Sequence, residues 1–139
     1  MQNYVRAFVA GFLSTLVFHQ SVIFLLYKLG VFTRPPWNMT AVPPFDVPAV
    51  LSLAFWGGVW GIPIWYLMRH ATGAAYWVRA IVFGAIGPTV VAILVVSRIK
   101  SGDFSAASNV QFWIGGLIVN GVWGLGLGLF MRWLKRVGL

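Results

Sequence analysis

The sequence contains no cysteine and very little acid, since only 2 of its 139 residues are Asp or Glu. Without cysteine the chain has no disulfide, thiol nucleophile, acylated cysteine, iron–sulfur ligand or thiolate zinc site. No acidic residue falls inside a hydrophobic run, so the chain lacks both the membrane carboxylate of proton-coupled antiporters and an oxygen-rich site for divalent cations. No Ser–His–Asp set, H-E-x-x-H pair or phosphate-binding glycine loop appears either. These absences disfavour an enzyme and predict neither cofactor nor metal site.

Apolar residues, by contrast, are abundant: 60% of the chain is hydrophobic, 9% is charged, and the mean hydropathy is +0.86. This apolar content is too high for a soluble surface to cover, so the sequence predicts an integral membrane protein. The formal net charge is +8. Its Lys and Arg residues lie at the ends of hydrophobic runs, where the positive-inside rule explains them. We therefore expect the lipid bilayer, and no nucleic acid, as a partner.

Four hydrophobic runs are each long enough to cross a bilayer as a helix. They extend over about Val5–Leu29, Val47–Met68, Tyr76–Val96 and Val110–Leu134. The first run is too long for a signal peptide and is followed by no small-x-small cleavage site, so we expect a mature helix. The fold class predicted is an all-α integral membrane protein with four transmembrane helices, in a single membrane domain over 1–139.

The distribution of Lys and Arg predicts the orientation of these helices. The amino-terminal side, the second connection and the tail carry six of them, namely Arg6, Arg69, Arg79, Arg132, Lys135 and Arg136. The opposite side carries four, Lys28, Arg34, Arg98 and Lys100, together with both acids, Asp46 and Asp103. The excess predicts a multi-pass protein of the cell inner membrane with both termini in the cytoplasm.

The three connections differ in kind. The first, Val31–Pro48, holds five of the seven prolines, with Trp37 and Phe45 between them. It is too rich in proline to be helical, so we expect an extended, semi-rigid outer loop whose aromatic residues form a lid or a docking surface. The second, His70–Ala75, is predicted to be a tight turn. The third, Ser97–Asn109, is predicted to be a polar loop.

Two short matches within the chain predict an internal repeat. Val5–Gly11 aligns with Val78–Gly84 at an offset of 73, and Gly58–Gly61 aligns with Gly121–Gly124 at an offset of 63. Because each unit contains two spans, both copies would insert in the same direction, as two parallel helical hairpins. The predicted copies cover about 5–69, which includes the proline-rich outer loop 31–48, and about 76–136.

Small residues at helical spacing predict close helix–helix contacts, because they let neighbouring backbones approach. The candidates are Ala7, Gly11, Ser14, Gly57, Gly58, Gly61, Gly84, Gly87, Gly116, Gly121, Gly124 and Gly128. Four short helices would have difficulty burying every such face in one bundle. We therefore expect some of these faces to meet another copy of the chain or a partner in a membrane complex.

Polar residues inside the spans form a candidate site. His19 is the only titratable group at membrane depth, and its counterpart in the second copy is Ala92, so duplication does not explain it. With Thr15, Gln20 and Asn120 it makes up an expected polar centre. Two interpretations stay open: an interhelical hydrogen bond that fixes packing, and a site for a ligand, an ion or a proton.

Three functions are compatible with these features. The first is a small non-enzymatic membrane protein that self-assembles or serves as an accessory subunit of a membrane complex. The second is a channel or transporter for a small neutral or anionic solute, with its site around His19. The third is a cofactor-binding membrane subunit. Haem held by two histidines within one chain is disfavoured, because His70 lies at the opposite membrane edge.

Overall fold

A computed structural model describes all residues, 1–139, and is helical apart from its connections and one two-residue strand pair. Four helical segments are long and apolar enough to cross a membrane, which confirms the predicted all-α, multi-pass architecture. In chain order the elements, with η for a π-helical segment, are α1 (Gln2–Ser14), η1 (Thr15–His19), α2 (Gln20–Lys28), β1 (Ala41–Val42), β2 (Val47–Pro48), α3 (Ala49–Met68), α4 (Gly73–Val91), η2 (Ala92–Val96), α5 (Ser97–Ser101), α6 (Ser105–Ser108) and α7 (Val110–Arg136).

The third span is longer than its sequence predicts, because Ser97–Ser101 continues the helix instead of starting a loop. Serine hydroxyls can donate to the carbonyl four residues earlier, which keeps them bonded inside a helix. Here Ser97 donates to the carbonyl of Ile93, and Ser101 donates to that of Ser97 at 2.8 Å. The polar connection therefore shrinks to residues 102–109, and it contains the short helix α6.

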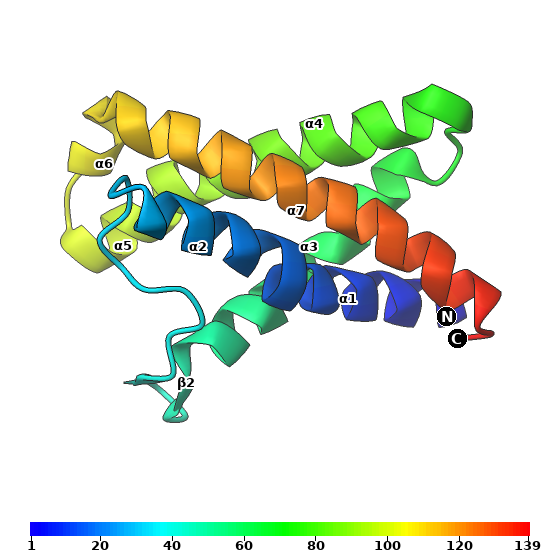
Figure 1. Ribbon diagram of the computed structural model, residues 1–139, viewed down its shortest axis with the longest axis horizontal. Helices are drawn as coiled ribbons and strands as arrows, with labels where there is room; N and C mark the ends of the chain where they lie inside the picture. The colour runs from blue at the N-terminus through cyan, green and yellow to red at the C-terminus, as the bar shows by residue number, and fades with distance from the viewer.

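The helices form two antiparallel pairs joined by the last helix. The segment α1–η1–α2 packs against α3, α4 packs against α7, and α7 also packs along α1 (Figure 1). Both chain ends and the turn between α3 and α4 lie at one end of the bundle, which we call the terminal end. The proline-rich connection and α5–α6 lie at the other, which we call the loop end. With half of its most apolar stretch buried, α7 is the most enclosed span.

Backbones touch in both pairs at corresponding places. A Cβ atom on Gly61 would lie 2.3 Å from the carbonyl oxygen of Ala7, and one on Gly124 would lie 2.2 Å from that of Ala80. Real Cβ atoms do not come this close to backbone, so only glycine fits at either position. Close approach of this kind gives van der Waals contact between helices where lipid removes the hydrophobic driving force.

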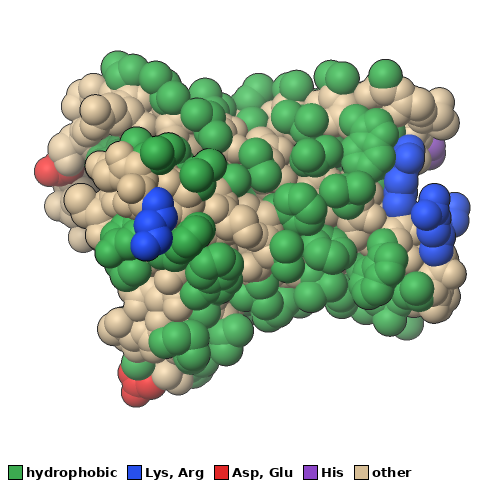
Figure 2. Space-filling view, viewed as in Figure 1, with side chains coloured by type: hydrophobic (Ala, Val, Ile, Leu, Met, Phe, Trp, Pro, Cys, Tyr) green, Lys and Arg blue, Asp and Glu red, His purple; other side chains and the backbone are tan.

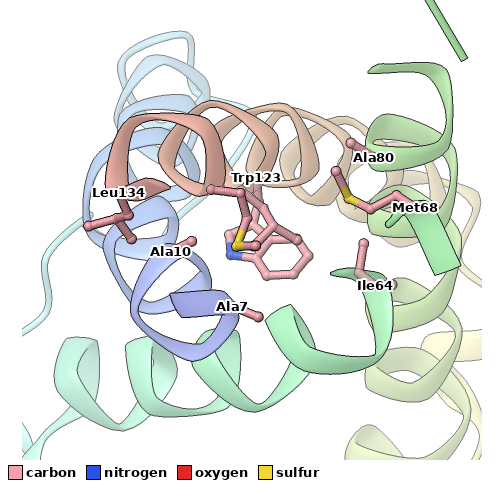
Figure 3. Packing of buried hydrophobic residues seen from close by; sticks show 9 residues of the cluster. Ala7, Ala10, Ile64, Met68, Ala80, Trp123 and Leu134 are labelled. Atoms are coloured by element: carbon pink, nitrogen blue, oxygen red, sulfur yellow. The ribbon is translucent and has the colours of Figure 1, made fainter. Parts of the chain in front are cut away.

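Trp123 joins the two pairs at the centre of the bundle. Its indole N–H donates to the carbonyl oxygen of Gly11 at 3.0 Å, and the hydroxyl of Ser14 donates to the carbonyl of Trp123 at 2.6 Å. A buried indole needs such an acceptor, and the membrane supplies none. Figure 3 shows Trp123 surrounded by small and aliphatic side chains from the other spans, including Ala7, Ala10, Ile64, Met68 and Ala80.

The loop end carries two unlike connections. The first contains an antiparallel hairpin in which Ala41 pairs with Pro48 and Val42 pairs with Val47, and it projects away from the helices (Figure 1). The second is compact: Asp103 accepts hydrogen bonds from Ser105 and Ser101, and these bonds hold the pKa of Asp103 below its usual value. Figure 2 shows the acidic groups at this end and an apolar belt between the two ends.

Candidate functional site

The four residues of the expected polar centre do not bond to one another. The hydroxyl of Thr15 donates to the carbonyl of Gly11 at 3.0 Å and lies against Gly57 of α3. Asn120, on α7, donates from Nδ2 to the hydroxyl of Thr89 on α4 at 2.9 Å. These two polar residues therefore take part in helix packing, one in each helix pair.

Gln20 binds the proline-rich connection. Its Oε1 accepts the backbone N–H of Trp37 at 2.7 Å, and the indole N–H of Trp37 donates to the carbonyl of Leu16 at 2.9 Å. Trp37 has φ +47°, in the left-handed region that a bulky residue rarely adopts, so these bonds hold it in a costly conformation. The connection is thus fastened to the first span at one residue.

The π-helical segment η1 explains why the carbonyl of Leu16 is free to accept this bond. In a regular α-helix the N–H of Gln20 would donate to Leu16, but here it donates to Thr15 and Val17. The second pair has the corresponding arrangement at η2, where the N–H of Ser97 donates to Ala92. There the freed carbonyl of Ile93 accepts the hydroxyl of Ser97 from the same helix.

His19 alone among the four has no partner. Its Nδ1 atom is buried and makes no hydrogen bond within the chain. A buried polar atom without a partner costs free energy and is uncommon in a folded protein. His19 is therefore the one residue of the expected polar centre whose side chain makes no hydrogen bond within the chain.

The small residues at the expected contact positions all lie against other helices of the same chain. Gly58 lies against the ring of Phe8, and Gly116 against Thr89. Ala7, Gly11, Ser14, Gly57, Gly61, Gly84, Gly87, Gly121, Gly124 and Gly128 likewise have neighbours on another span. A substitution at one of them therefore tests the fold of a single chain before it tests any assembly.

A second candidate site, which the sequence did not single out, is a basic cavity of about 570 Å³ at the terminal end. Its lining includes Arg6 from α1, Arg69 from the turn after α3, and Arg132 and Lys135 from α7. From the sequence alone these cations have a role only in orientation. The one local sign of the cavity is Tyr66, which precedes Arg69 by about one helical turn. Tyr76 meets its cation, Arg132, only once the helices are packed.

No group of three His, Cys, Asp or Glu side chains lies close enough together to hold a metal ion. Comparison with protein-family models, curated proteins and solved structures finds no match to this chain. The fold therefore defines the class: a multi-pass helical membrane protein with two tightly packed helix pairs.

Proposed function

We propose that this protein is a non-enzymatic subunit of a membrane assembly, formed either with further copies of itself or with another membrane protein that it serves as an accessory subunit. The observation that carries the proposal is Phe45, which is 83% exposed at the tip of the hairpin on the proline-rich connection. A large apolar side chain held in the open, away from the bundle, suits contact with a partner.

The rigidity of the connection supports this assignment. Trp37 binds it to Leu16 and Gln20 by two hydrogen bonds, and the hairpin then ends directly in α3. Asp46, next to Phe45, has φ +51°, so the tip also keeps a left-handed residue in place. A surface ordered before binding loses less conformational entropy when it docks, which favours recognition.

The use of polar groups inside the membrane supports a non-enzymatic role. Thr15, Gln20 and Asn120 each have a hydrogen-bond partner within the chain, and no carboxylate lies within any span. Groups that fix helix packing are not free to take part in proton transfer or covalent chemistry. Apart from His19, the groups that remain for interaction lie at the two ends of the bundle.

The proposal includes the finer predictions about organisation. The paired contacts Gly61–Ala7 and Gly124–Ala80 support two copies of one helical hairpin inserted in the same direction. The excess of Lys and Arg at the terminal end supports a cytoplasmic position for both termini in the inner membrane. The hairpin would then face outward, toward the periplasmic part of a partner or a second copy.

A photocrosslinking residue in place of Phe45 tests the proposal in intact membranes. We expect a discrete protein adduct, of twice the chain mass for self-assembly or of another fixed mass for an accessory role. Phe104 is the matched control, because it is an exposed phenylalanine at the same end of the bundle. The proposal fails if Phe45 gives no protein adduct, or if both positions give the same adducts in equal yield.

A second candidate function is passage of a small neutral or anionic solute near His19, and one observation favours it. The unpartnered Nδ1 of His19 is a polar group left over from packing, as a transient binding site would need. Flux of such solutes into liposomes containing His19→Ala should then fall. Flux equal to that of the wild-type protein would exclude this path.

The third function, a cofactor-binding membrane subunit, has a test of its own. A colourless, metal-free purified sample would exclude it.

A further inference from the structure

The basic cavity at the terminal end gathers basic side chains from distant parts of the chain. Arg6, Arg69, Arg132 and Lys135 line it together with His70, and no acidic residue does. Both acids of the chain, Asp46 and Asp103, lie at the loop end instead (Figure 2). Orientation by the positive-inside rule requires cations near this membrane surface, but it does not require cations from three parts of the fold to surround one cavity.

Aromatic rings fix two of these cations by their faces. The Cζ atom of Arg69 lies 3.9 Å from the ring centroid of Tyr66, and that of Arg132 lies 4.4 Å from the ring centroid of Tyr76 and 4.6 Å from that of Trp77. A guanidinium group over a ring contacts it through its cationic centre. It has five N–H donors in all, and those that remain free can form paired hydrogen bonds to two phosphate oxygens.

A helix end in the lining also favours an anion. The helix α4 begins at this cavity, and the side chain of its N-cap residue, Thr72, makes no capping bond. The positive end of a helix dipole therefore adds to the charges of Arg69, Arg132 and Lys135. Arg6 contributes to the wall instead, because it is 8% exposed and its donors already bind Asn3 and the backbone oxygen of Leu139.

An apolar cavity of about 530 Å³ adjoins the basic one, and Arg132 lines both. Its apolar lining comes mainly from α7, with Leu129, Phe130 and Trp133, and reaches Phe18 in η1. Arg136, near the end of α7, is the second cation that lines it beside Arg132. Phe18 lies twelve residues beyond Arg6 along the first span, which is about 18 Å deeper in the membrane by helical rise. The pair of cavities thus changes from strongly basic to apolar in the direction from headgroup to hydrocarbon.

We propose that these two cavities form a binding site for one anionic phospholipid, whose phosphate group lies among Arg69, Arg132 and Lys135 and whose acyl chain lies along α7 beside Phe130. The group that the cations would bind is a phosphate ester. Both a lipid headgroup and a soluble metabolite can present such a group. The adjoining apolar cavity favours the lipid as its source, because a soluble phosphate has no use for it. The site does not depend on assembly and stands apart from the hairpin at the loop end.

Native mass spectrometry of the purified full chain, titrated with dioleoyl phosphatidylglycerol, tests the proposal against dioleoyl phosphatidylcholine. We expect the anionic lipid to bind at least about tenfold more tightly, and the double variant Arg69→Gln/Arg132→Gln to lose about that factor. Arg98→Gln is the matched control and should change the affinity less than about twofold, because Arg98 also stacks on a ring, 4.1 Å from Phe104, but lies at the loop end. Equal affinity for the two lipids, or equal loss in variant and control, would overturn the proposal.

A further variant and a soluble headgroup analogue complete the experiment. If the double variant does not fold, as judged by its thermal unfolding, Lys135→Gln on the exposed rim should weaken binding by about fivefold. No change in that variant would count against the site. Glycerol 1-phosphate, a soluble headgroup analogue, should bind more than about tenfold more weakly than the lipid. Binding as tight as that of the lipid, with the same arginine dependence, would assign the site to a soluble phosphate and overturn the lipid proposal.

Discussion

The two helix pairs have the same contact at their centres and different structures at the loop end. In each pair a glycine backbone rests on an alanine carbonyl, at Gly61 and Ala7 in one and at Gly124 and Ala80 in the other. Both first helices also contain a π-helical segment that frees one carbonyl. The contact recurs in both pairs, so the fold requires it, whereas the projecting hairpin occurs only once and is available for interaction.

The way in which the freed carbonyl is satisfied accounts for this difference. In the second pair the hydroxyl of Ser97, on the same helix, binds the carbonyl of Ile93, and the connection that follows is short. In the first pair Trp37, twenty-one residues along the chain from Leu16, binds the freed carbonyl and anchors a long connection. One kind of helix irregularity is thus bonded within its own helix in one pair and holds an external hairpin in the other.

The largest effect is expected where the pairs are most alike. Gly61→Ala and Gly124→Ala should each lower the free energy of unfolding by at least about 2 kcal/mol, because the added methyl group overlaps a backbone carbonyl. Gly121→Ala, on the same helix as Gly124, is the control, since its Cβ would meet the nearest atom at an ordinary 3.5 Å. Denaturant titrations in detergent measure all three. A mild Gly61→Ala beside a severe Gly124→Ala would break the equivalence of the two contacts.

A smaller effect should distinguish the loop ends. Trp37→Phe removes the indole donor to Leu16 and should cost about 1 kcal/mol, and it should also make the segment 31–48 more sensitive to limited proteolysis. Ser97→Ala removes the equivalent donor to Ile93 without loosening a long connection. If proteolysis of 31–48 is unchanged in Trp37→Phe, Trp37 does not anchor the hairpin.

The polar bond within the second pair should contribute less. A double-mutant cycle with Asn120→Leu and Thr89→Val should give a coupling energy of about 0.6 kcal/mol, which is typical of hydrogen bonds between helices in membranes. The counterpart of Asn120 in the first pair is Gly57, which offers no side-chain donor. A coupling energy of zero in unfolding measurements would show that the bond between Asn120 and Thr89 does not stabilise the second pair.

The smallest effect should come from His19. Because its Nδ1 has no partner, His19→Leu removes a buried unsatisfied atom and should leave stability unchanged or raise it by less than about 0.5 kcal/mol. Thermal unfolding in detergent checks this, with Gln20→Leu as a contrast that breaks the bond to Trp37 and should be destabilising. A clear loss of stability in His19→Leu would reveal a partner for the imidazole.

The sequence was sufficient for the four spans, because runs of about 20 apolar residues have few other uses. It also placed small residues such as Gly61 and Gly124 at contacts between helices, and the structure has each of them against a neighbouring span. The sequence does not say which span each of them meets. All of them have neighbours within the chain, and contact with a second copy stays a prediction.

Tertiary structure decides the features that sequence patterns did not reveal. The π-helical segment η1 is accompanied by a tryptophan that returns from the following connection, and no local pattern around Leu16 encodes that contact. The same holds for Gln20, whose partner is the backbone of Trp37. The sequence does not predict the basic cavity, because Arg6 and Lys135 are separated by most of the chain and meet only once the helices are packed.

Extraction of the protein from its membrane in polymer-bounded lipid discs tests directly whether this chain belongs to an assembly. The quantity to measure is the mass of the extracted particles. The proposed assembly predicts particles that hold more than one protein chain in a fixed ratio, either several copies of this chain or this chain with one partner. The ratio should change when Phe45 is replaced by Asp, because the exposed ring at the hairpin tip is the proposed contact. Particles that hold a single copy of this chain and no other protein would contradict it.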